Sequence, residues 1–183
     1  MIQLISFLLA LLLVENSEAQ SNTSVECSRN YHFDLILLAT EWPETFCEDR
    51  PCQAHRDKWA IHGAWPENYD DTWPSNCCTK HPFNESALEP IKSELIDHWK
   101  SLKTNGTDNE FWAHEYCKHG TCAIESPLMQ DELSYFKSTL DAFKKLSIEK
   151  WLSSEGIVPS SSKTYSLESF HLAIKKNLGH TAQ

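Results

Sequence analysis

Residues 111–122, Phe-Trp-Ala-His-Glu-Tyr-Cys-Lys-His-Gly-Thr-Cys, carry the strongest chemical signal in the chain. Two histidines, a glutamate and a lysine fall within six positions, at His114, Glu115, Lys118 and His119. If the segment is helical, the first histidine and the lysine share one ridge and the glutamate and second histidine the next, because residues four apart are neighbours. One imidazole that accepts a proton and another that donates one, beside a cation and a carboxylate, can support phosphodiester cleavage without a metal.

A third histidine in a suitable setting, His62, lies upstream in residues 59–66, Trp-Ala-Ile-His-Gly-Ala-Trp-Pro. By itself, a histidine at a strand end is more often a core residue whose ring nitrogens are hydrogen-bonded. A His-Glu pair on a helix more often belongs to a polar face exposed to solvent. Aromatic residues flank the cluster at Phe111, Trp112 and Tyr116. Together with the upstream histidine, they favour a functional site over both alternatives.

Three tryptophans near these segments are candidate substrate-binding residues: Trp65, Trp73 and Trp112. A large flat indole can stack on a nucleobase. Core packing is the alternative role, and we expect it for at least one of the three.

The histidine spacing argues against a metal hydrolase. In zinc proteases of the zincin type, two histidines four residues apart meet one metal. His114 and His119 are five positions apart, which is about 140° around an ideal helix. No two cysteines have the spacing of a zinc knuckle. The sequence therefore predicts no metal site and no cofactor.

Residues 1–19 have the pattern of a secretory signal peptide. Residues 4–14 form a nearly unbroken apolar run that is too short to span a bilayer. Small residues, Ser17 and Ala19, stand where a signal peptidase would cut. The alternative is a buried apolar strand or helix. No later segment could cross a membrane, so we expect one exported domain over residues 20–183.

Cysteines and glycosylation sequons agree with export. The chain has seven cysteines, and a secreted protein with this many is typically disulfide-bonded, although an odd count leaves at least one free or paired with another chain. Asn22, Asn84 and Asn105 each begin an Asn-x-Ser/Thr sequon in polar, turn-like sequence. These sequons predict N-glycosylation.

The charge of the chain limits what it can bind. Its formal net charge of -10 argues against a protein that coats nucleic acid, because such proteins are basic. Nine histidines would bring this charge to about -1 if all were protonated, which would relax repulsion of polyanions at acidic pH. The composition is compatible with an enzyme that works in acidic secretions, endosomes or lysosomes.

Hydrophobic patterning predicts an α+β fold, with several helices packed on a small antiparallel sheet. Apolar residues over 33–40 and 58–63 predict two strands, the second ending at Gly63. Residues 64–83 are rich in proline, asparagine and aspartate, which is typical of turns.

Apolar residues at spacings of three and four predict the helices. These helices cover residues 88–102, 133–143, 148–152 and 166–178. A further helix carries the histidine cluster, with Asp108 or Asn109 as its N-cap and Gly120 as its terminator.

Residues 59–66 and 111–122 together resemble the two active-site segments of the T2 ribonucleases. This family comprises the secretory acid ribonucleases and includes the plant self-incompatibility ribonucleases. Both segments are long and occur in the family's order, and a weaker likeness extends over about residues 33–180. The resemblance implies an α+β endoribonuclease that cleaves single-stranded RNA without a metal.

The resemblance also implies a role for each charged residue. The ribose 2'-hydroxyl attacks the adjacent phosphorus, leaving a 2',3'-cyclic phosphate that is hydrolysed to a 3'-phosphate. His119 is then the general base on the 2'-hydroxyl, and His62 the general acid for the leaving 5'-oxygen. Glu115 and Lys118 attend the crowded phosphorus, and His114 contacts phosphate. DNA, which lacks the 2'-hydroxyl, is not expected to be cut.

Further expectations follow from the same likeness. It implies disulfides between Cys47 and Cys52 and between Cys122 and either Cys77 or Cys78, with Trp65 and Trp73 helping to form a base pocket. The family continues past residue 178 with further strands, whereas this chain stops at residue 183. We therefore expect the C-terminal strands to be missing.

The leading functional hypothesis is a secreted, glycosylated endoribonuclease, working outside the cell or in endosomes or lysosomes. The alternative is a weak or inactive secreted glycoprotein ligand that derives from such an enzyme. It would act through surface contacts or through glycan-mediated contacts with a receptor. The three sequons and the shortened C-terminus motivate this alternative.

Overall fold

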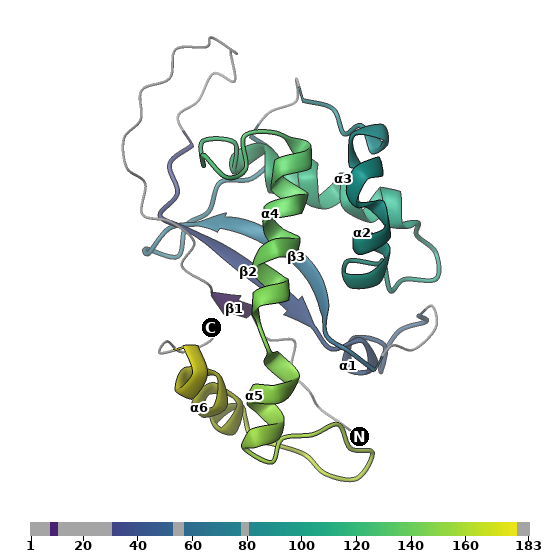
Figure 1. Ribbon diagram of the computed structural model, residues 1–183, viewed down its shortest axis with the longest axis vertical. Coiled ribbons are helices and arrows are strands. Elements are labelled where there is room, and N and C mark those ends of the chain that lie inside the picture. Colours follow the sequence, from purple (N-terminus) through teal and green to yellow (C-terminus); the bar gives the residue numbers. More distant parts are fainter. Residues whose placement is uncertain (1–7, 11–30, 53–56, 78–80, 179–183) are drawn as a thin grey trace.

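A small antiparallel sheet with helices around it forms the fold, which confirms the predicted α+β class (Figure 1). The computed structural model describes residues 8–10, 31–52, 57–77 and 81–178. Its strands are β1 (Leu8–Ala10), β2 (Leu35–Glu41) and β3 (Ala60–Glu67), in the order β1-β2-β3. Strand β1 falls within the segment predicted to be a signal peptide, so its removal would leave that edge of β2 unpaired.

Strand β3 is longer than predicted. It continues past Gly63 to Glu67, and Pro66 pairs with Ile36 of β2. The proline suggested a turn, but β3 is an edge strand of the described sheet, where a missing N–H costs no ladder hydrogen bond. The prediction that the turn region begins at Ala64 was therefore wrong.

A β-bulge interrupts the pairing of β2 and β3 at His62. Ala39 pairs with Gly63 and Thr40 pairs with Ile61, which leaves His62 without a partner in the register. An extra residue of this kind reverses the alternation of side chains along the strand. As a result, Ile61 and Ala64 both face the core although they are three residues apart.

Helices cover the sheet, and Figure 1 shows α4 crossing β2 and β3. The α-helices are α1 (Pro43–Phe46), α2 (Lys92–His98), α3 (Asp108–Lys118), α4 (Glu132–Lys145), α5 (Ile148–Ser154) and α6 (Leu167–Leu178). Two 3-10 helices, η1 (Glu85–Ile91) and η2 (Gly120–Cys122), precede α2 and follow α3. No helix of the described residues is both long and apolar enough to cross a membrane.

The helix predicted over residues 88–102 differs from the observed segment. Its first part is the 3-10 helix η1, which contains Pro90, and α2 ends at His98. Proline has no N–H to donate within a helix, which accounts for the irregular first part. Leu102 is buried although it lies beyond the helix, and it borders a recess rather than joining the main core.

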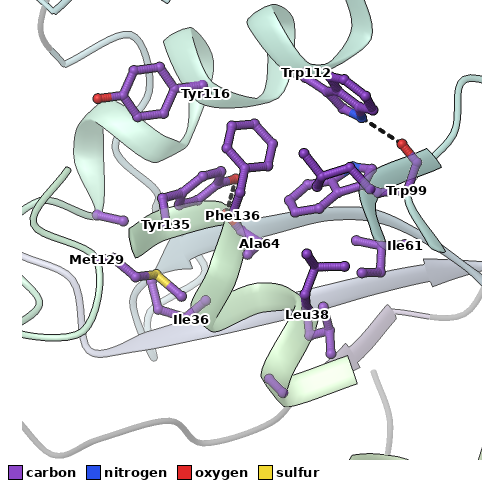
Figure 2. Close-up of a cluster of buried hydrophobic side chains, with 14 of the residues drawn as sticks. Ile36, Leu38, Ile61, Ala64, Trp99, Trp112, Tyr116, Met129, Tyr135 and Phe136 are labelled. Atoms are coloured by element: carbon purple, nitrogen blue, oxygen red, sulfur yellow. Dashed lines mark hydrogen bonds between the residues drawn. The ribbon is translucent and has the colours of Figure 1, made fainter. Parts of the chain in front are cut away.

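The main core lies between the sheet, α2, α3 and α4, and is rich in aromatic side chains (Figure 2). Their polar atoms bond to backbone carbonyls: Trp99 Nε1 donates to His62 O at 2.9 Å, and Tyr135 Oη donates to Ala64 O at 2.9 Å. Buried indole and phenol groups need such partners. These two bonds fix the backbone of β3 on both sides of Gly63.

Helix α3 begins with a capping box that the sequence analysis missed. Thr107 is the N-cap, and its hydroxyl accepts from the backbone N–H of Glu110, whose carboxylate accepts from Thr107 N in return. Asp108, one of the two predicted caps, instead accepts from Ser101 N at 2.8 Å. The four residues Thr-Asp-Asn-Glu carry the signature of this cap and were sufficient to find it.

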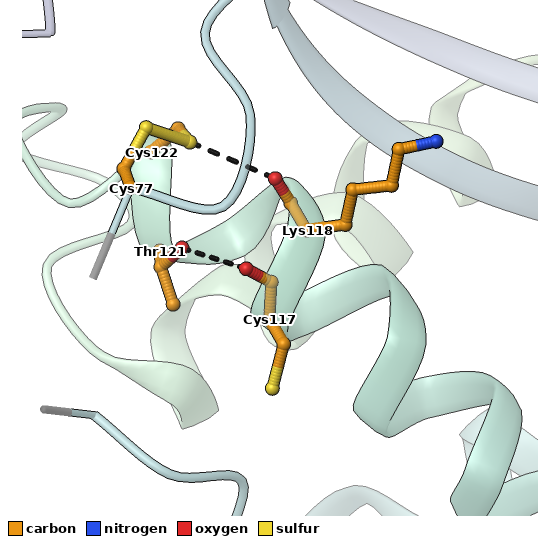
Figure 3. The surroundings of a disulfide bond; sticks show 5 residues. All are labelled: Cys77, Cys117, Lys118, Thr121 and Cys122. Carbon is orange, nitrogen blue, oxygen red and sulfur yellow. Dashed lines mark hydrogen bonds between the residues drawn. A yellow bond between two sulfur atoms is a disulfide. The ribbon is translucent and has the colours of Figure 1, made fainter. Parts of the chain in front are cut away.

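Two disulfides join segments around α3 and α1. Cys77, rather than Cys78, bonds to Cys122, which ties the segment after β3 to the end of α3 (Figure 3). In the same place Asn76 N donates to Lys118 O at 2.8 Å. Cys47 bonds to Cys52. Cys27 and Cys78 lie outside the described residues.

Adjacent residues of α2 give a test of the core. Leu95 is fully buried, whereas Ile96 is exposed. Leu95→Ala should lower the free energy of unfolding by about 2–5 kcal/mol, because it removes buried methyl groups and leaves a cavity. Ile96→Ala should change it by less than about 0.5 kcal/mol. Urea denaturation measures both, and equal effects would contradict this packing.

Candidate active site

Strand β3 and helix α3 bring the predicted catalytic residues together. Strand β3 supplies His62, and the last turns of α3 supply His114, Glu115 and Lys118. His119 is the C-cap of α3, where its N–H donates to Glu115 O at 2.9 Å. Residues more than fifty positions apart in the sequence therefore meet in one place.

Gly63 allows the helix and the strand to approach each other at this point. A methyl group on Gly63 would collide with the Glu115 carboxylate and with the Trp65 indole. The bare backbone thus makes room for the hydrogen bond that Trp65 Nε1 donates to Glu115 Oε2 at 2.9 Å.

Glu115 is the centre of the site. Only 2% of the residue is exposed, and Oε1 lies 3.9 Å from His62 Nε2 and 4.0 Å from His114 Nε2. Burial raises the pKa of Glu115, although the bond from Trp65 and the nearby charges of His62 and Lys118 oppose the shift. The carboxyl group therefore keeps its proton to a higher pH than an exposed glutamate does.

His62 is held by a carboxylate that the sequence analysis did not single out. Glu41 Oε2 lies 2.9 Å from His62 Nδ1. Burial alone would lower the pKa of His62, but the hydrogen bond and charge of Glu41, with the charge of Glu115, raise it above 6.5. A glutamate at the end of an otherwise apolar strand was the one signal in the sequence that could have revealed this contact.

His119 has the opposite electrostatic setting. It is buried, and its ring stacks on Trp65 with centroids 5.1 Å apart and an interplanar angle of 26°. Burial, followed by the charge of Lys118, lowers its pKa to about 3. The Nδ1 atom of His119 is buried and makes no hydrogen bond within the described structure. The surroundings of His119 therefore favour its neutral form.

His114 borders solvent, with 61% of its side chain exposed. Partial burial, then Lys118 and Lys103, lower its pKa. Its ring reaches the same carboxylate oxygen of Glu115 as His62 does. The three side chains form one polar cluster at the surface.

Two recesses adjoin this cluster. The first, of about 410 Å³, is lined by His62, His114 and Glu115 together with Glu41, Lys103 and Phe111. The second, of about 320 Å³, is lined by His119, Lys118, Trp65, Trp73, Pro66 and Glu67. The two histidines with opposite pKa shifts therefore open into different recesses.

The three candidate tryptophans occupy different environments. Trp73 is 63% exposed and lines the second recess. Trp65 also lines it, but its indole already contacts His119 and Glu115. Trp112 is 1% exposed, and its Nε1 donates to Trp99 O in the core (Figure 2). The proposed substrate contact of Trp112 therefore does not fit, because no surface of this indole is left for a base.

Other predicted features lie around the site. Asn84 and Asn105 are exposed, while Asn22 is outside the described residues. Cys117 is exposed and has a free thiol, and Figure 3 shows its side chain extending in a different direction from that of Lys118. Within the described ranges, no three histidine, cysteine or acidic residues are grouped so that they could hold a metal ion.

Known proteins are similar to this chain in sequence and in fold. The pattern of the Ribonuclease T2 family matches residues 33–183. Ribonuclease DdI of Dictyostelium discoideum is 35% identical over 179 residues, which are 97% of this chain and 78% of that protein. Intracellular ribonuclease LX of Solanum lycopersicum is 35% identical over 164 residues, covering 86% of this chain and 67% of the relative.

Solved structures agree with the sequence comparison. RNase NT, solved in complex with 5'-AMP, superposes with a TM-score of 0.73 at 33% identity, over 82% of this chain and 75% of that chain. Because sequence and fold agree over most of the chain, the protein belongs to the Ribonuclease T2 family of RNA-cleaving enzymes.

Proposed function

We propose that this chain is an endoribonuclease that cleaves single-stranded RNA by acid–base transphosphorylation without a metal. The observation that supports this most directly is the pair of histidines with opposite pKa shifts, His62 beside the buried Glu115 and His119 on the Trp65 ring that bonds to Glu115. Two groups whose environments push their pKa values apart are suited to act as acid and base at one pH.

In the proposed first step, neutral His119 accepts the proton of the ribose 2'-hydroxyl as the oxygen attacks phosphorus. Protonated His62 gives its proton to the 5'-oxygen as the bond between that oxygen and phosphorus breaks. The products are a 2',3'-cyclic phosphate and a free 5'-hydroxyl. In the second step a water molecule opens the ring to a 3'-phosphate, with the two histidines in reversed roles.

Glu115 and Lys118 act on the phosphate as its charge increases. Lys118 provides a cation next to His119, and it offsets the negative charge of the pentacoordinate phosphorus. Glu115 is drawn towards its protonated form, in which it can donate a hydrogen bond to a phosphoryl oxygen. His114 contacts phosphate from the exposed side.

The two recesses fit the nucleotides on either side of the scissile phosphate. Trp73 offers an exposed indole face in the second recess, on which a base can stack. Phe111 offers an aromatic ring in the first. Stacking and splayed bases are typical of single-stranded RNA recognition, which is why we assign this substrate.

Export through the secretory pathway is part of the proposal. It is supported by the apolar run of residues 4–14, by the disulfides, and by exposed sequons at Asn84 and Asn105. The relative from Solanum lycopersicum is named an intracellular ribonuclease, so retention in an acidic compartment of that pathway falls within the proposal.

Cleavage of single-stranded RNA in EDTA at pH 5 tests the reaction. Wild-type protein should leave cyclic phosphate ends, and His62→Ala and His119→Ala should each lower the rate by about 100- to 10,000-fold, because each removes a proton-transfer group. His32→Ala, at an exposed histidine outside the site, is the control. Folded, disulfide-intact wild type that cuts no RNA between pH 4 and 8 would refute the proposal.

The rate should follow a bell-shaped curve with its maximum on the acidic side of neutrality. Activity rises as His119 loses its proton, around its pKa of about 3. It falls as His62 loses its proton, around a pKa raised above 6.5. The measurement is kcat/KM of a dinucleotide substrate against pH, with circular dichroism to show that the fold persists. A value of kcat/KM that keeps rising past pH 8 would contradict the role of His62 as general acid.

Glycine substitution tests the close approach of β3 and α3. Gly63→Ala should break the hydrogen bond between Trp65 and Glu115 and lower kcat by at least about tenfold, because the carboxylate must move. In Gly106→Ala, at a glycine that also lines the first recess, the new methyl would meet nothing nearer than Ser101 Oγ at 3.8 Å and would leave the Glu115 carboxylate in place. The kcat of this matched variant should fall far less than that of Gly63→Ala. Equal losses of kcat would show that the contact at Gly63 is unimportant.

A further inference from the structure

We propose that Glu41 is a positioning residue that orients His62 and keeps it charged for its role as general acid. This inference rests on the proposed function, and it adds a residue that neither active-site segment contains. The contact that carries it joins the last residue of β2 to the bulged residue of β3.

Glu41 is built into the structure rather than exposed at its surface. Only 2% of the residue is exposed, at the end of a strand in which every residue is buried. Its Oε2 lies 2.9 Å from His62 Nδ1, and the residue also borders the first recess. Burying a carboxylate costs free energy unless it has a hydrogen-bonded partner. The His62 imidazole supplies such a partner for Glu41.

The contact determines which ring nitrogen does the chemistry. A carboxylate can only accept, so Nδ1 of His62 must carry a hydrogen in both the neutral and the charged ring. The proton that comes and goes is then the one on Nε2. That atom faces Glu115, with 3.9 Å between His62 Nε2 and Glu115 Oε1. In the proposed function, the scissile phosphate binds beside these two atoms.

Charged groups face His62 from several elements. Glu41 comes from β2 and Glu115 from α3, and both favour the charged ring. Lys103, in the loop before α3, opposes it, and the rings of His114 and His119 are also close enough to interact with it. Glu41 is the largest of the favourable contributions, because it combines a hydrogen bond with its charge.

The test compares Glu41→Gln and Glu41→Asp with the wild type. The Gln amide can still accept a hydrogen bond but carries no charge, whereas Asp keeps the charge on a shorter side chain. The control is Glu48→Gln, which removes one exposed acidic residue outside the site. Two quantities are measured: the pH profile of kcat/KM, and the titration of the His62 ring followed by NMR.

In Glu41→Gln, the alkaline limb of the profile and the His62 titration should both move down by about one pH unit. Activity above neutrality should fall about tenfold, with little loss near pH 5, where His62 remains protonated. In Glu41→Asp, which keeps the charge, both quantities should move down much less than in Glu41→Gln. Glu48→Gln should resemble the wild type.

An equal loss of activity at every pH, with the His62 titration unchanged, would overturn the proposal and leave Glu41 a purely structural residue. If Glu41→Gln does not fold, Glu41→Asp alone provides the test. Asp keeps the negative charge, so a downward move of the alkaline limb by about one pH unit in Glu41→Asp would contradict a role for that charge. If the wild type cleaves no RNA, the proposed function fails, yet the His62 titration still decides whether Glu41 controls this ring.

Discussion

The close contact of β3 with α3 at Gly63 is the constraint on which the site depends. Because position 63 has no side chain, the Glu115 carboxylate reaches the strand and accepts from the Trp65 indole. His62 lies beside that carboxylate, His119 stacks on the Trp65 ring that donates to it, and the two histidines line different recesses. A side chain at this position would displace the Glu115 carboxylate and the Trp65 indole from their present contact.

Burial makes the polar cluster chemically useful as well as costly. The Glu115 carboxyl group is almost fully buried, so its partners Trp65 and His62 are needed to compensate for lost hydration. The same low-polarity surroundings act differently on the two histidines. Glu41 reverses the effect of burial at His62, whereas His119 has a cation beside it and stays neutral. The opposite charge preferences of the two histidines therefore arise from the different residues that surround each ring.

The rest of the fold keeps the strand and the helix in register. Trp99 and Tyr135 donate to the carbonyls of His62 and Ala64, so the aromatic core holds the strand through its backbone. At the other end of the site, the Cys77–Cys122 disulfide and the bond from Asn76 to Lys118 secure the end of α3. These backbone contacts fix the two elements that carry the candidate site residues without using the side chains of His62 and Lys118.

The sequence by itself determined which polar residues α3 brings together and where most of the helices lie. His114, Glu115, Lys118 and His119 fall within six positions, and residues three or four apart are neighbours on a helix. The capping box at Thr107 was also readable. Only the tertiary structure decided that Glu41 pairs with His62, 21 residues away, and that Trp112 is core while Trp73 is exposed. The physical reason is that these outcomes depend on strand register, the bulge at His62 and packing between distant segments, none of which leaves a local periodicity in the sequence.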